Sequence, residues 1–129
     1  MKSLKVLDLF CGCGGLSLGF EMAGFEVKLA IDNWEDALVT YRNNRLNART
    51  LNADLLCLNP IDVDKLFQIK NVDVIIGGPP CQGFSVAGKR IIDDERNKLY
   101  KSFVRFVDYC RPKAFVMEKH SNVWFSCVT

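Results

Sequence analysis

Short apolar runs alternate with segments of helical periodicity along most of the 129-residue chain. The runs that predict strands are 4–10, 25–31, 48–55, 72–76 and 113–117. The segments that predict helices are 16–22, 34–45, 60–68 and 98–110. Alternation of this kind favours a parallel sheet with right-handed crossovers and helices on both faces. We therefore predict one α/β domain, for which the chain is long enough.

The run from Val72 to Ile76 (VDVII) is apolar enough to be buried on both faces, as a central parallel strand is. Binding sites in sheets of this type lie at the carboxyl ends of the strands. The glycine-rich and polar segments of this chain each follow a predicted strand. We expect them to meet along one edge of the sheet.

The composition sets limits on the class of protein. A net charge of +2 is too small to indicate nucleic-acid binding by itself. Basic residues are concentrated between positions 89 and 105, and on charge alone a solvated helix face is the favoured interpretation of that cluster. No apolar stretch approaches the roughly 20 residues of a membrane span. We expect a protein without a membrane segment.

The six cysteines raise the question of a disulfide framework or a metal site. The start of the chain is a poor signal peptide, because Asp8 and several glycines interrupt its apolar run. There is no CxxC pair, and His120 is the only histidine. These features predict reduced thiols, no metal and a cytoplasmic location.

The first loop, Phe10 to Gly15 (FCGCGG), joins the first strand to the first helix. Glycine lets a backbone turn tightly and lets a ligand approach closely. Three glycines in four positions, with Asp8 on the strand before them, favour a ligand loop over a merely structural turn. A dinucleotide fingerprint would have a further glycine in place of Ser17. The loop therefore suits a ligand without a phosphate.

Two aspartates end the next two predicted strands. Asp32 can accept hydrogen bonds from both hydroxyls of a ribose, as carboxylates do at this position of nucleotide-binding sheets. It is equally suited to cap the helix that begins near Trp34, and one residue can do both. Asp54 is placed to accept from an adenine amino group. Ribose and adenine without phosphate favour S-adenosylmethionine.

The segment from Gly77 to Ser85 (GGPPCQGFS) places Cys81 on a loop stiffened by two prolines. Free cysteines are mostly inert core residues. Composition alone leaves this alternative open for Cys81. On a rigid loop at the ligand edge, beside basic residues, Cys81 is a candidate nucleophile. Cys57, Cys110 and Cys127 lack such surroundings, and we expect them to be packing residues.

Residues 8–15 (DLFCGCGG) and 78–85 (GPPCQGFS) resemble the first and fourth motifs of the DNA cytosine-5 methyltransferases. The resemblance includes Asp32, Asp54 and the segments 94–99 and 115–118, and so covers roughly residues 4–118. It implies a Rossmann-like, S-adenosylmethionine-dependent methyltransferase fold, incomplete and with its first five strands. Residues 119–129 would then be a divergent tail.

The resemblance also implies the chemistry. In this family the target cytosine is turned out of the duplex. Cys81 would attack C6, and Glu118 would hydrogen-bond the ring near N3 and stabilise the developing charge. The basic residues of segment 82–98 would meet DNA phosphates. The residues implied to line the S-adenosylmethionine pocket are Phe10, Gly12, Gly14, Asp32, Asp54 and Leu99.

The sequence departs from the family after Glu118, where Asn-Val is expected directly and three other residues precede Asn122. Nothing corresponds to a target recognition region, and family members are several hundred residues long. The alternatives are therefore an inactive truncated remnant or one subunit of a split methyltransferase that needs a C-terminal half. An RNA cytosine methyltransferase is a further alternative. The family favours a restriction–modification setting.

Overall fold

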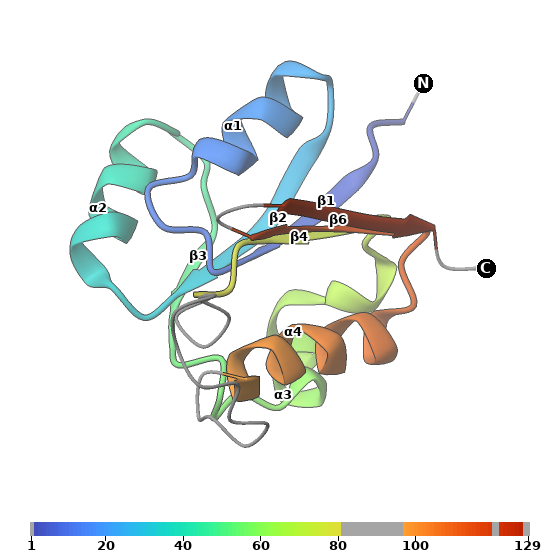
Figure 1. Ribbon diagram of the computed structural model, residues 1–129. Coiled ribbons are helices and arrows are strands. Elements are labelled where there is room, and N and C mark those ends of the chain that lie inside the picture. Colours follow the sequence, from blue (N-terminus) through green and yellow to red (C-terminus); the bar gives the residue numbers. More distant parts are fainter. Residues whose placement is uncertain (1, 81–96, 120–121, 128–129) are drawn as a thin grey trace.

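The computed structural model describes residues 2–80, 97–119 and 122–127 (Figure 1). A six-stranded sheet has the order β3-β2-β1-β4-β5-β6. The strands are β1 (Lys5–Leu9), β2 (Glu26–Asp32), β3 (Thr50–Asn52), β4 (Val74–Gly77), β5 (Ala114–Lys119) and β6 (Asn122–Cys127). The helices are α1 (Gly15–Met22), α2 (Glu35–Asn43), α3 (Pro60–Phe67), the short 3-10 helix η1 (Ile69–Asn71) and α4 (Asn97–Cys110).

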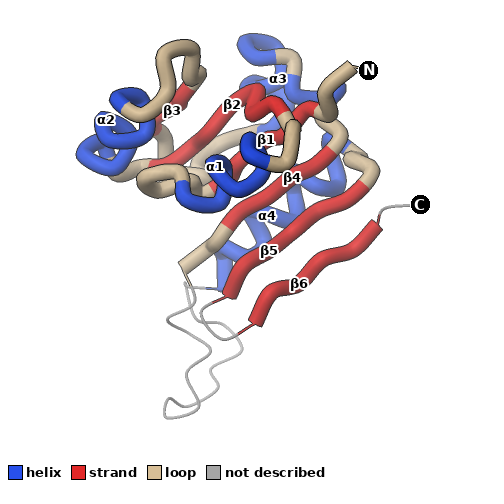
Figure 2. The backbone as a smooth tube through the Cα atoms, turned by 90° about the horizontal axis from the view of Figure 1, so that it is seen from above, coloured by secondary structure: helices blue, strands red, loops and turns tan. Residues whose placement is uncertain are grey.

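The predicted α/β architecture is confirmed. Strands β1 to β5 run parallel, with α1 and α2 on one face of the sheet and α3 and α4 on the other (Figure 1). Figure 2 shows the strands side by side, with α4 behind β4 and β5. Each predicted strand and helix is present, although β3 is only three residues long where a run of eight was expected.

Strand β6 was not predicted. It pairs antiparallel with β5, from Lys119 opposite Asn122 to Ala114 opposite Cys127. The sequence between Asn122 and Cys127 (NVWFSC) is rich in β-branched and aromatic residues, which favour strands. The tail expected over residues 119–129 therefore contributes an edge strand to the sheet.

The main apolar core lies between the sheet and the α3–α4 layer. Leu7 and Leu9 of β1 point into it and are fully buried with Phe103 and Phe106 of α4. The ring of Phe103 meets Phe115 of β5 edge to face, with 6.1 Å between the ring centres. Because side chains alternate along a strand, Asp8, the residue of β1 between these leucines, faces α1 instead.

The carboxyl ends of the parallel strands come together, as the sheet topology requires. Leu9 at the end of β1 is in register with Ile31 of β2 and with Gly77 of β4. A Cβ atom on Gly77 would lie 2.3 Å from the carbonyl oxygen of Leu9, so only glycine fits at this approach. Within the described residues, no helix has the length and apolar character needed to cross a membrane.

Candidate active site

A hollow of about 70 Å³ opens at the carboxyl ends of β1, β2, β3 and β4. Its lining residues are Phe10, Asp32, Asn33, Ala53, Asp54, Leu55, Pro80 and Leu99. They come from the loops that follow four different strands and from the first turn of α4. The structure thus brings together four of the predicted cofactor residues, namely Phe10, Asp32, Asp54 and Leu99.

Asp32 ties two elements together at this hollow. Its Oδ2 accepts the backbone N–H of Gly12 at 2.8 Å, and its Oδ1 accepts the backbone N–H of Trp34 at 3.0 Å. The second contact closes a turn just before α2, whose N-cap residue is Trp34, so the prediction that Asp32 caps this helix is wrong. A carboxylate oxygen can accept more than one hydrogen bond, so Asp32 retains acceptor capacity for a ligand.

Asp54 also lines the hollow, from the loop after β3. Its Oδ1 accepts the backbone N–H of Leu56 at 2.9 Å, which closes a turn of the kind that aspartate favours. The thiol of Cys57 lies 3.9 Å from Oδ2. The turn fixes the direction of the carboxylate, which is half-buried and also lines the hollow.

The glycine loop runs along the end of β2, and the two glycines predicted to bind the cofactor differ in their surroundings. Gly12 has a φ of 53°, and a Cβ atom there would meet nothing within 4 Å, so the backbone faces open space. Gly14 has a φ of 93°, and a Cβ atom there would lie 2.6 Å from atoms of Arg45 and Tyr41. Neither glycine lines the hollow itself, and Gly14 packs against the α2 side.

The segment that leads to Cys81 contacts both halves of the predicted site. Pro80 lines the hollow, and a Cβ atom on Gly78 would lie 4.0 Å from Oε2 of Glu118. Glu118 is exposed near the end of β5. Cys81 and the predicted DNA-contacting residues 82–96 lie outside the described part of the chain.

Sequence reasoning missed half of the lining of the hollow. Asn33 is exposed there, and its amide both donates and accepts hydrogen bonds. Its place directly after a strand-ending aspartate was a signal that could have identified it. Ala53 and Leu55 flank Asp54, and an apolar side chain at a strand end has no pattern that separates it from the core.

Arg105, one of the clustered basic residues, has a structural partner. Its Nη2 donates to the carbonyl oxygens of Leu55 at 3.0 Å and Leu58 at 3.3 Å. It thereby ties α4 to the loop that carries Asp54. Within residues 2–80, 97–119 and 122–127, no cluster of three or more His, Cys, Asp or Glu side chains is suited to hold a metal ion.

The cysteines outside the two motifs only partly match their predicted role. Cys110 is buried, and its burial raises the pKa of the thiol to about 12, which keeps it protonated. Cys57 and Cys127 are exposed, so the prediction that they are packing residues is wrong. Cys57 comes after the edge strand β3, and Cys127 ends the edge strand β6. Few side chains are available at the edge of a sheet to cover these thiols.

The sequence profile of the family described as C-5 cytosine-specific DNA methylase matches residues 4–123. The chain belongs to this family. The Type II methyltransferase M.DdeI of Desulfomicrobium norvegicum is 48% identical over 115 residues, which are 89% of this chain and 27% of that protein. M.HgiGI, a Type II methyltransferase of Herpetosiphon aurantiacus, is 42% identical over 118 residues, and the match covers 89% of each chain.

A solved structure supports the fold. A putative DNA modification methyltransferase encoded within an E. coli prophage superposes with a TM-score of 0.77 at 42% sequence identity. The superposition covers 91% of this chain and 32% of that one. The methyltransferase fold expected from the sequence is therefore confirmed. The chain spans between 27% and 38% of the length of three curated relatives.

Proposed function

We propose that this chain supplies the cofactor site and the nucleophile of an enzyme that methylates C5 of cytosine in DNA, with S-adenosylmethionine as the methyl donor and in a restriction–modification setting. The observation that carries the proposal is the position of residues 78–80. They join the hollow lined by Phe10, Asp32 and Asp54 to the neighbourhood of Glu118, directly before Cys81.

The residues around the hollow fit S-adenosylmethionine, which supplies an electrophilic methyl group when bound. Asp32 offers acceptors to the ribose hydroxyls and Asp54 to the adenine amino group, while Phe10 and Leu99 provide apolar walls. None of the described lining residues is basic, which suits a nucleoside without phosphate. A volume of about 70 Å³ is below the roughly 300–1,000 Å³ of ligand pockets, so these residues form one wall of the site.

The proposed reaction requires a covalent step because C5 of cytosine is a weak nucleophile. The Cys81 thiolate adds to C6 of a cytosine turned out of the duplex, and the electron pair moves to C5. C5 then bonds to the methyl carbon as the bond from that carbon to the sulfonium sulfur breaks, which leaves a neutral thioether. C5 gives up its proton to solvent, and Cys81 leaves as the thiolate as the C5–C6 double bond re-forms. Glu118 hydrogen-bonds the ring near N3 and stabilises the charge that develops during the addition.

Covalent trapping tests this proposal. The chain is incubated with S-adenosylmethionine and duplex DNA that carries 5-fluorocytosine in many sequence contexts, because fluorine at C5 blocks the final elimination. We expect an adduct that survives denaturation, and we expect Cys81→Ala to abolish it. Cys127→Ala is the matched control, since this exposed thiol lies at the end of the edge strand β6. An adduct that persists in Cys81→Ala contradicts the assignment of the nucleophile.

A second candidate is a chain that needs a separate C-terminal half, or an inactive remnant. This candidate is favoured because the chain spans only 27–38% of the length of three relatives. The match to M.HgiGI, in contrast, covers 89% of both proteins. The trapping experiment is repeated with a candidate C-terminal half. An adduct that forms only on mixing indicates a split enzyme, and folded protein that forms none indicates a remnant. Fluorocytosine-containing RNA tests the RNA alternative in parallel.

A further inference from the structure

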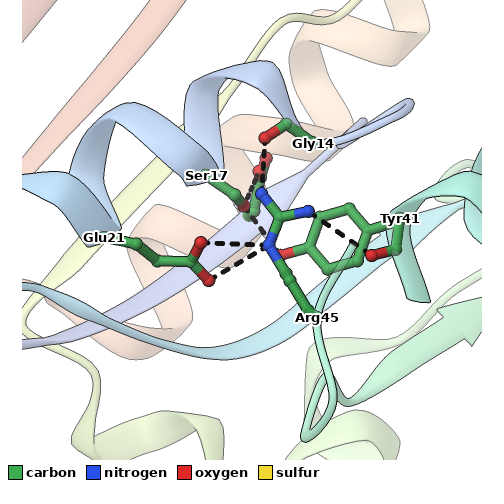
Figure 3. Close-up of polar contacts among 6 residues, drawn as sticks. Gly14, Ser17, Glu21, Tyr41 and Arg45 are labelled. Carbon is green, nitrogen blue, oxygen red and sulfur yellow. Dashed lines mark hydrogen bonds and ion pairs between the residues drawn. The ribbon is translucent and has the colours of Figure 1, made fainter. Parts of the chain in front are cut away.

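A cluster of polar side chains lies beneath the glycine loop, on the face of the sheet covered by α1 and α2 (Figure 3). We call it the α1–α2 polar cluster, and its members are Asp8, Gly14, Ser17, Glu21, Tyr41 and Arg45. None of these side chains lines the hollow. The proposed chemistry uses none of them, so the cluster needs a separate explanation.

Arg45 joins this cluster to the loop backbone. Its Nη2 donates to the carbonyl oxygen of Gly14 at 2.7 Å, and its Nε pairs with Glu21 at 3.0 Å. The guanidinium carbon lies 4.0 Å from the centre of the Tyr41 ring, on which the group stacks. Only 11% of the Arg45 side chain is exposed. The planar guanidinium of arginine makes all these contacts simultaneously, and a lysine ammonium cannot do so.

Tyr41 extends the cluster to the central strand. Its hydroxyl donates to Oγ of Ser17 at 2.9 Å, and Ser17 in turn donates to Oδ2 of Asp8. All three residues are at most 1% exposed. Oδ1 of Asp8 has no hydrogen-bond partner among the described residues, whereas Oδ2 is bonded. Buried hydrogen bonds of this kind favour one arrangement of the elements that carry them. The chain of bonds therefore fixes α1 and α2 relative to β1.

The contact at Gly14 is transmitted through the loop. The carbonyl oxygen of Gly14 also accepts the N–H of Leu18 at 2.9 Å, and the N–H of Gly14 donates to the carbonyl of Cys11 at 3.0 Å. Cys11 is followed by Gly12, whose backbone N–H donates to Asp32 at the hollow. A short series of hydrogen bonds thus leads from Arg45 through Gly14 to the ribose-binding carboxylate of the proposed site.

We propose that Arg45 and Tyr41 are positioning residues for the cofactor site, which hold Gly14 against α2 and thereby fix the loop that presents Gly12 to Asp32. The inference rests on the proposed function, because the loop matters to binding only where S-adenosylmethionine occupies this edge. Neither residue touches the ligand. Their substitution changes affinity for the cofactor through the geometry of the loop.

The test combines two variants with a control in α2. Arg45→Lys keeps the charge and removes the fork, and Tyr41→Phe keeps the ring and removes the hydroxyl. Arg42→Lys is the control, since Arg42 bonds Glu35 at 2.6 Å and Thr50 at 3.0 Å and contacts nothing in the loop. Amide hydrogen exchange is measured by NMR on the free chain, and binding of S-adenosylmethionine is measured by calorimetry.

We expect Arg45→Lys to speed exchange at Gly12, Gly14 and Leu18 by roughly tenfold, the effect of losing a charge-assisted hydrogen bond. Exchange in β4 and β5 stays unchanged, and binding of S-adenosylmethionine weakens by a similar factor. Tyr41→Phe changes the same quantities in the same direction but less, and Arg42→Lys changes neither.

Unchanged exchange at the loop in Arg45→Lys overturns the inference, as does an equal rise throughout the sheet, which indicates a general loss of stability. Faster loop exchange with undiminished binding also overturns the link to the cofactor. Failure of the folded wild-type chain to bind S-adenosylmethionine at all is a different result. It removes the proposed function of the edge, while the exchange data still decide whether Arg45 positions the loop.

Discussion

Both faces of the sheet bury apolar side chains, but the α1–α2 face also carries a buried polar cluster, and β1 contributes side chains to both faces. Towards α3 and α4 it presents Leu7 and Leu9 to an apolar core that includes Phe103. Towards α1 it presents Asp8, which is 1% exposed and bonded to Ser17. Apolar burial is strong but non-directional, whereas hydrogen bonds fix direction. Apolar burial therefore stabilises both faces, and the hydrogen bonds of the α1–α2 face additionally fix the geometry of the loop.

The largest expected effect tests the α3–α4 face. Phe103→Ala removes a fully buried ring that contacts Phe115, and we expect it to lower the free energy of unfolding by about 3–5 kcal/mol. Chemical denaturation measures the loss. Val104→Ala on the same helix is the control, because Val104 is 43% exposed and its loss should cost at most about 0.5 kcal/mol. Equal losses in the two variants contradict the role of apolar burial on this face.

The polar cluster should give stability a pH dependence of its own. Burial raises the pKa of Asp8 from 3.8 to about 7; the nearby Asp32 and Glu21 add to the rise, while Ser17 and Arg45 oppose it. In that range the folded chain keeps a proton that the unfolded chain releases. The contribution of Asp8 to stability therefore falls as pH rises from about 4 to about 7, by an amount on the order of a few kcal/mol, and then levels off.

Asp8→Asn checks this sign, because the amide resembles the protonated acid and does not titrate. Unfolding free energies are compared between about pH 5 and about pH 8 for wild type and variant. We expect the wild type to lose stability relative to Asp8→Asn as the pH rises. A constant difference between the two proteins across this range contradicts the buried, proton-holding role of Asp8.

The smallest of these effects concerns the contact between the loop and α2. Gly14→Ala introduces a Cβ atom 2.6 Å from Arg45 and Tyr41 at a φ of 93°, and we expect it to cost about 1–3 kcal/mol. Gly19→Ala is a matched control within α1, where a Cβ atom meets nothing within 4 Å. It should stabilise the helix by about 0.5–1 kcal/mol. Thermal unfolding measures the stability of both variants. Equal changes in stability would mean that Arg45 and Tyr41 do not pack closely against Gly14.

The elements and their order could be predicted because apolar periodicity is a local signal. The rule that sites lie at the carboxyl ends of parallel strands then brought Asp32 and Asp54 to one edge, and the family resemblance added Phe10 and Leu99. Strand β6 escaped prediction because the family resemblance weakens after Glu118, although the residues from Val123 to Phe125 favour a strand.

The polar cluster could not be predicted, because its contacts join residues distant in sequence. Asp8 was interpreted as support for a ligand loop, yet its side chain faces α1 and not the hollow. The sequence pattern marks Ser17 only as the position where a dinucleotide fingerprint has a glycine. In the structure Ser17 links Asp8 to Tyr41, which lies 24 positions after Ser17. Local patterns do not reveal which face of a strand a later helix will cover.

The measurement that tests the central claim most directly is calorimetric binding of S-adenosylmethionine to the wild-type chain, to Asp54→Asn and to Asp62→Asn. Asp54→Asn keeps an acceptor for the N–H of Leu56 and removes the charge at the hollow, while Asp62 is an exposed aspartate of α3. We predict binding by the wild type, affinity weaker by roughly tenfold in Asp54→Asn, and no change in Asp62→Asn. Absence of binding by folded wild-type protein, or equal affinity in all three, would contradict the assignment of this edge as the cofactor site.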